Sequence, residues 1–160
     1  MEQAITDQLP DWFERAGENV RQLYTYWRGK CRGGSLPSRA DIDPTEIPRL
    51  LPYLTIVEVV PDNRRYVYRL VGTKEVEIRG QDPTGKSVAE AYYGPSIEEA
   101  YASYDRTILA AQPHYDDSPF VGPGGRYNDD EMLFLPLSDD GQNVTRILVI
   151  SQSSLTPDFA

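Results

Sequence analysis

The chain has 160 residues, which fits one domain with a core large enough to need no disulfide or metal. Its net charge of −9 opposes a duplex-binding surface, because such a surface needs clustered lysine and arginine to neutralise phosphates. Its apolar runs are too short to span a membrane, and its acidic, amphipathic start is unlike a signal peptide. The single cysteine, Cys31, excludes an internal disulfide and any CxxC metal site. We therefore expect a cytoplasmic protein without nucleic-acid or membrane partners.

One helix is predicted over residues 9–31. Apolar residues recur there at alternating intervals of four and three, a heptad-like stripe typical of a helix that buries one face. Two interpretations remain open: the helix lies on its own domain, or it pairs with the same helix of a second copy. The second interpretation predicts a homodimer whose interface contains Leu9, Phe13, Val20, Leu23 and Trp27.

A β-hairpin follows a proline-rich stretch. Residues 54–60 are rich in β-branched side chains, residues 65–71 alternate in polarity, and Pro61-Asp62-Asn63 between them is a turn signal. The alternation places three large side chains on one face of the second strand: Tyr66, Tyr68 and Leu70.

Short helical pieces are expected over residues 72–93, followed by one longer helix. Ser96 and Glu99 have the spacing of a capping box, and the helix should stop by Gln112 because Pro113 follows. The last third of the chain then predicts three strands, at residues 114–121, 128–137 and 145–151.

Three runs of the sequence carry a family resemblance. LPSRADIDPTEIPRLLPYLTIVEVV, YRLVGTKEVEIRGQDPTGKSV and LFLPLSDDGQNVTRILVI together resemble a PAS-like family common in alphaproteobacteria, over about residues 36–151. The resemblance implies an α+β fold, namely a PAS-like five-stranded antiparallel sheet with helices between strands 2 and 3, plus an N-terminal helix. It divides the chain into an N-terminal helical extension (1–34), a PAS-like domain (35–152) and a tail (153–160).

The same resemblance implies signalling or binding and no defined reaction, so we expect neither an enzyme nor a cofactor. It implies a sensory module that contacts an unknown signalling protein and is tuned by a small molecule between sheet and helices. Seven aromatic residues are the candidate ligand-binding set: Tyr66, Tyr68, Tyr92, Tyr93, Tyr101, Tyr104 and Phe134. The alternative is a packed aromatic core that binds nothing, which would make the chain a ligand-free dimerisation scaffold.

Nucleotide binding and metal binding are disfavoured by the residues around the candidate motifs. Residues 80–87 match the phosphate-binding pattern GxxxxGK[ST], but the charged residues 74–79 before them do not form a buried strand, so we expect a structural loop. His114 is the only histidine, which excludes a multi-histidine metal site and leaves haem ligation by one histidine as an alternative. Arg69 interrupts an apolar strand and needs a partner, for which Glu58 is the candidate.

Overall fold

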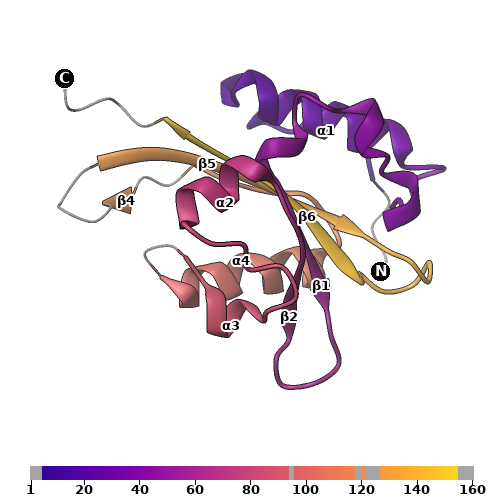
Figure 1. Cartoon of the computed structure of the whole chain (residues 1–160). Helices are drawn as coiled ribbons and strands as arrows, with labels where there is room; N and C mark the ends of the chain where they lie inside the picture. The colour runs from indigo at the N-terminus through magenta and orange to yellow at the C-terminus, as the bar shows by residue number, and fades with distance from the viewer. Residues whose placement is uncertain (1–4, 94–95, 118–119, 122–126, 155–160) are drawn as a thin grey trace.

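The computed structural model describes residues 5–93, 96–117, 120–121 and 127–154 (Figure 1). Its centre is an antiparallel sheet with the strand order β2-β1-β6-β5-β3, which confirms the predicted five-stranded sheet. A two-residue strand, β4, also pairs with β5. The strands are β1 (Leu54–Val59), β2 (Tyr66–Val71), β3 (His114–Asp116), β4 (Phe120–Val121), β5 (Tyr127–Leu137) and β6 (Arg146–Ser154).

The predicted hairpin is confirmed, but β2 contains a bulge that the alternating pattern hides. Ile56 lies opposite Leu70 and Val57 opposite Tyr68, so Arg69 is an extra residue on β2. A bulge reverses the faces of the residues that follow it. Tyr68 accordingly packs on one side of the sheet and Leu70 on the other, so the prediction that they share a face is wrong.

The predicted strand 114–121 consists of two pieces, β3 and β4. Asp116 lies opposite Met132 and Phe120 lies opposite Asn128, so both pieces pair with β5 in one continuous register. Residues 117–119 separate them, and of these 118–119 lie outside the described residues. The other strands agree with the prediction to within one to three residues at their ends.

Two helices cover one face of the sheet, α3 (Val88–Ala91) and α4 (Ile97–Ala110), whereas α2 (Thr73–Arg79) lies beside the turn Leu51–Tyr53. The Ser96 side chain accepts a hydrogen bond from the Glu99 backbone N–H at 3.2 Å, which confirms the predicted start of α4. We call the face of the sheet under α3 and α4 the helix-covered face.

The N-terminal third of the chain covers the opposite face, with α1 (Glu18–Lys30) above the sheet in Figure 1. The predicted helix over 9–31 is too long. Ala16 and Gly17 are extended, and the Gly17 N–H donates to Glu131 Oε1 at 2.7 Å, so only a short turn precedes α1. The turns of this layer are η1 (Phe13–Arg15), η2 (Arg39–Asp41), η3 (Pro44–Glu46) and η4 (Leu51–Tyr53).

The sheet is therefore the middle of three layers, with apolar residues on both of its faces. In β5, Leu133 and Leu135 belong to the N-terminal side of the core, whereas Phe134 belongs to the helix-covered side. This alternation is the one predicted for residues 128–137. Among the described residues, no helix combines the length and apolarity needed to cross a bilayer.

Candidate functional site

The helix-covered face gathers most of the predicted ligand-binding residues. Tyr66, Tyr68, Tyr104 and Phe134 are at most 5% exposed within this part of the core. Tyr92 and Tyr101 are half-buried at its margin. Tyr93 is 49% exposed, so the structure does not bring it into the group.

The aromatic rings of this group pack directly against one another. The Tyr66 ring centre lies 4.8 Å from that of Tyr104 and 5.8 Å from that of Tyr101. Tyr104 meets Phe134 edge-on at 5.6 Å, and His114 stacks on Phe134 at 5.5 Å. These are favourable separations for aromatic pairs. The rings thus occupy much of the space between sheet and helices.

The Tyr66 hydroxyl already has a protein partner. It donates a hydrogen bond to Asp105 of α4, and Arg65 forms an ion pair with the same carboxylate. The Arg65 guanidinium also lies over the rings of Tyr66 and Tyr101, at 5.3 and 4.9 Å. Burial, and then the bond to Asp105, raise the pKa of Tyr66, so its hydroxyl stays protonated. This cluster joins the β1–β2 hairpin to α4.

Arg79 is a member of the group that sequence reasoning missed. It is the last residue of α2, and its guanidinium carbon lies 4.8 Å from the centre of the Tyr68 ring. Nη1 donates to the Tyr68 hydroxyl and to the Ala91 carbonyl, each at 3.4 Å. A basic residue in the last turn of a helix is ordinary. Nothing in the local sequence signals that its side chain turns inward.

His114, at the border of this group, is half-buried. Burial lowers its pKa, the Arg106 charge lowers it further, and Asp116 acts in the opposite direction. Among the described residues, no group of three or more His, Cys, Asp or Glu side chains could hold a metal ion.

Two sequence motifs are placed away from any reactive arrangement. Residues 80–87 follow the helix α2 and lead into the four-residue α3, so they lack the preceding strand that a phosphate-binding loop requires. Cys31 ends α1 on the N-terminal side of the sheet, opposite the helix-covered face. Burial raises the pKa of its thiol to about 11.

The predicted dimer residues divide into a buried and an accessible set. Val20, Leu23 and Trp27 are 0% exposed within one chain, and the Trp27 indole N–H donates to the Pro136 carbonyl at 3.0 Å. They pack on their own sheet and are not available to a second copy, which corrects their assignment to an interface. Leu9 is 57% exposed and Phe13 is half-buried. The homodimer itself remains a prediction.

Strands β3 and β5 connect the aromatic group to the N-terminal layer. His114 faces Phe134, while the next residue, Tyr115, stacks on Trp12 with ring centres 4.7 Å apart. The Tyr115 hydroxyl donates to Glu131 Oε1 at 2.8 Å, the same oxygen that receives the Gly17 N–H. Strand β3 therefore touches the aromatic group on one face and Trp12 of the N-terminal layer on the other, and it shares the Glu131 carboxylate of β5 with Gly17.

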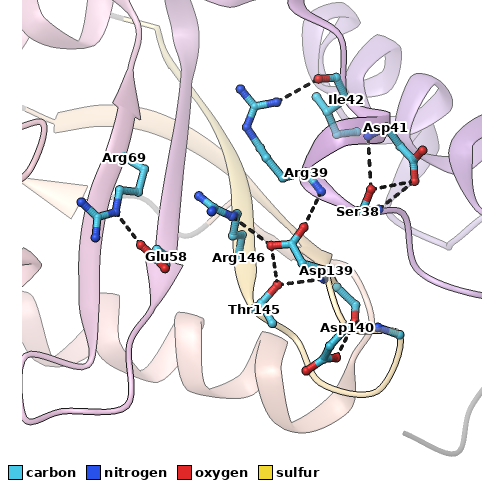
Figure 2. A network of polar contacts seen from close by, with 12 residues as sticks. Ser38, Arg39, Asp41, Ile42, Glu58, Arg69, Asp139, Asp140, Thr145 and Arg146 are labelled. Carbon is cyan, nitrogen blue, oxygen red and sulfur yellow. Dashed lines mark hydrogen bonds and ion pairs between the residues drawn. The ribbon is translucent and has the colours of Figure 1, made fainter.

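The predicted pair between Glu58 and Arg69 is present at an accessible end of the sheet (Figure 2). The Arg69 side chain is 41% exposed because the bulge turns it toward solvent, so it is not a buried charge. Nearby, Asp139 accepts from Arg146 Nε at 3.1 Å and from the Arg39 backbone N–H at 2.9 Å. These contacts fasten the chain around η2 to the sheet.

An open hollow of about 520 Å³ lies elsewhere, between the N-terminal segment and the end of α4. Its walls include the exposed Leu9 and the buried Trp12 and Tyr24. It contains none of the seven predicted ligand-binding residues.

Comparison with known families assigns this architecture. The model of the PAS domain matches residues 16–151, and the chain therefore belongs to the PAS domain family. The match includes α1, which the sequence had placed in an extension outside the domain.

Solved structures support the fold at low sequence identity. A light-oxygen-voltage domain studied with a flavin analogue is 12% identical, with a TM-score of 0.50 over 72% of this chain and 86% of that one. A sensory box sensor histidine kinase from Vibrio cholerae is 16% identical, with a TM-score of 0.50 over 70% and 90%. A comparison with curated proteins found no match.

Proposed function

We propose that this chain is a cytoplasmic PAS sensory module that mediates protein–protein interaction, and that a small ligand on the helix-covered face tunes that interaction. The observation that supports it best is the connection through β3, where His114 and Tyr115 face opposite layers. A partner signalling protein would contact the N-terminal layer, which is accessible at Leu9.

The route for a signal follows from the contacts. A ligand that inserts beside Tyr104 and Phe134 must displace rings that are now packed, and His114 rests on Phe134. A shift of β3 would alter the Tyr115 stack on Trp12 and the shared Glu131 carboxylate. The ligand changes the equilibrium only by its difference in affinity for the two arrangements.

Mass spectrometry of the freshly purified full chain, native beside denaturing, tests the ligand directly. We expect a fixed additional mass that is lost on denaturation. Hydrogen exchange before and after removal of that ligand should then change in the amides around Gly17, because the Gly17 N–H shares the Glu131 carboxylate with Tyr115 of β3. A ligand-free mass, with no protection change on adding any metabolite of a broad panel, would contradict the proposal.

A ligand-free dimerisation scaffold is the second candidate, and the tight ring packing around Tyr104 favours it. Since Leu23 and Trp27 are enclosed, such a dimer would have to use accessible residues such as Leu9. Leu9→Asp should then give a folded monomer in light scattering. An unchanged dimer mass in this variant would remove Leu9 from the interface.

A further inference from the structure

Arg79 has an incomplete set of hydrogen-bond partners at the margin of the helix-covered core. Its Nε is the one buried side-chain nitrogen or oxygen without a hydrogen-bond partner among the described residues. Its Nη1 makes two long contacts of 3.4 Å, to a hydroxyl and to a carbonyl. A buried donor that lacks an acceptor is unfavourable, and more so on a charged group.

The unused donors of Arg79 lie on one edge of the guanidinium group. Nη1 is on the side of Cδ, whereas the Nε hydrogen points to the same side as Nη2. Neither Nε nor Nη2 donates to an acceptor in the described part of the chain. Such an edge presents two nearly parallel N–H groups, which match the two oxygens of a carboxylate.

The surroundings of the Arg79 guanidinium include an aromatic ring, a hydroxyl and a carbonyl. Arg65 is paired with Asp105 and Arg69 with Glu58, whereas the two acceptors to which Arg79 Nη1 donates are uncharged. Tyr68, which lies under the guanidinium, is 1% exposed. Burial raises the pKa of Tyr104, whereas the Arg79 charge lowers it. The Arg79 charge therefore acts electrostatically on a residue of the aromatic group.

We propose that Arg79 binds the carboxylate of a small organic acid whose remaining atoms contact the tyrosine group. This rests on the proposed function, because it names the chemical class of the ligand at the same site. A single guanidinium balances one negative charge. A doubly charged phosphate would keep an excess charge beside Glu99, which already acts on Tyr92, in a chain of net charge −9. The structure thus favours a carboxylate.

The test is calorimetric titration of the full chain with matched probes. The carboxylates are propionate, benzoate and 4-hydroxybenzoate. The neutral counterparts are the corresponding amides, and inorganic phosphate and phenyl phosphate represent the other oxyanion. We expect at least one carboxylate to bind at least tenfold more tightly than its amide. Arg79→Met should abolish that binding, and Arg79→Lys should weaken it at least tenfold because lysine lacks the two-donor edge.

Arg64→Met is the matched control, since it removes the same charge from an exposed arginine that pairs with Asp62. It should leave the affinity within twofold. Circular dichroism establishes that each variant is folded. Binding that persists in Arg79→Met, preference for phosphate, or no binding by any carboxylate would overturn the assignment. A different ligand found by native mass spectrometry would then leave the proposed function standing, whereas a ligand-free chain would count against both.

Discussion

At the scale of single residues, Gly72 occupies a place where no side chain fits. A Cβ atom there would lie 2.4 Å from the backbone oxygens of Leu51 and Pro52, which cannot rotate away. We expect Gly72→Ala to lower the free energy of unfolding by about 3 kcal/mol, as overpacking does.

Gly29→Ala in α1 is the matched control, because nothing lies within 4 Å of its Cβ. It should stabilise the chain by about 0.5–1 kcal/mol. Urea titration of both variants decides the matter; equal effects would contradict the contact argument.

Asp140 gives the turn before β6 a pH dependence. Its carboxylate accepts hydrogen bonds from the backbone N–H groups of Asn143 and Gln142, at 2.7 and 2.8 Å. These bonds, the first from Asn143, lower its pKa to about 2 from 3.8. Because the folded pKa is lowered, the stabilisation is complete above 3.8 and is lost as the pH falls toward 2.

Asp140→Asn removes the charge and therefore this dependence. We expect the variant to be less stable than the original chain at pH 7, and the two unfolding midpoints to converge between pH 4 and pH 2, the window about 2 to 3.8 set by this carboxyl. Chemical denaturation at stepped pH measures the difference. A difference that stays constant down to pH 2 would show that the Asp140 charge is not its source.

At the scale of elements, α1 is part of the folded core. Trp27 is fully buried and its indole N–H donates to Pro136 on β5. Trp27→Ala should lower the free energy of unfolding by about 3–5 kcal/mol. Leu9→Ala, at a site that is 57% exposed, should change it by less than about 0.5 kcal/mol.

The concentration dependence separates this effect from dimer dissociation. If α1 packs on its own sheet, the loss in Trp27→Ala is the same at low and high protein concentration. If α1 instead pairs with a second copy, the loss would grow as concentration rises, because association then stabilises the original chain more than the variant. Denaturation at two concentrations tenfold apart distinguishes the two.

Regular patterns were predictable, and features set by distant contacts were not. The alternation in β5 and the Ser96 cap depend on neighbours in sequence, so they follow from it. The end of the N-terminal helix at Gly17 depends on Glu131, and the bulge at Arg69 depends on its pairing with β1. For the candidate site, the aromatic group was predictable from composition. The inward direction of the Arg79 side chain was not, because it depends on contacts with Tyr68 and Ala91, which lie on other elements.

At the scale of the whole molecule, the sheet is stable only when both of its faces are covered by the outer layers. Leu133, Leu135, Leu148 and Ile150 are all 0% exposed because the N-terminal layer covers them. A fragment of residues 35–152, the domain expected from the sequence alone, would expose this surface. We expect it to bind a hydrophobic dye and to unfold without a cooperative transition, unlike the full chain. A sharp two-state transition in the fragment would show that the sheet tolerates one bare face.

The position of β6 bears on how this chain folds in time. β6 is the last strand of the sheet in chain order, yet it lies between β1 and β5 and pairs with both. The central pairing of Ile56 with Leu148 joins segments from distant parts of the chain. Closing so large a loop lowers the chain entropy before the stabilising contacts between β1 and β6 have formed. Folding is therefore expected to be slow. We expect the β1–β2 hairpin to form early and β6 to pair with β1 later.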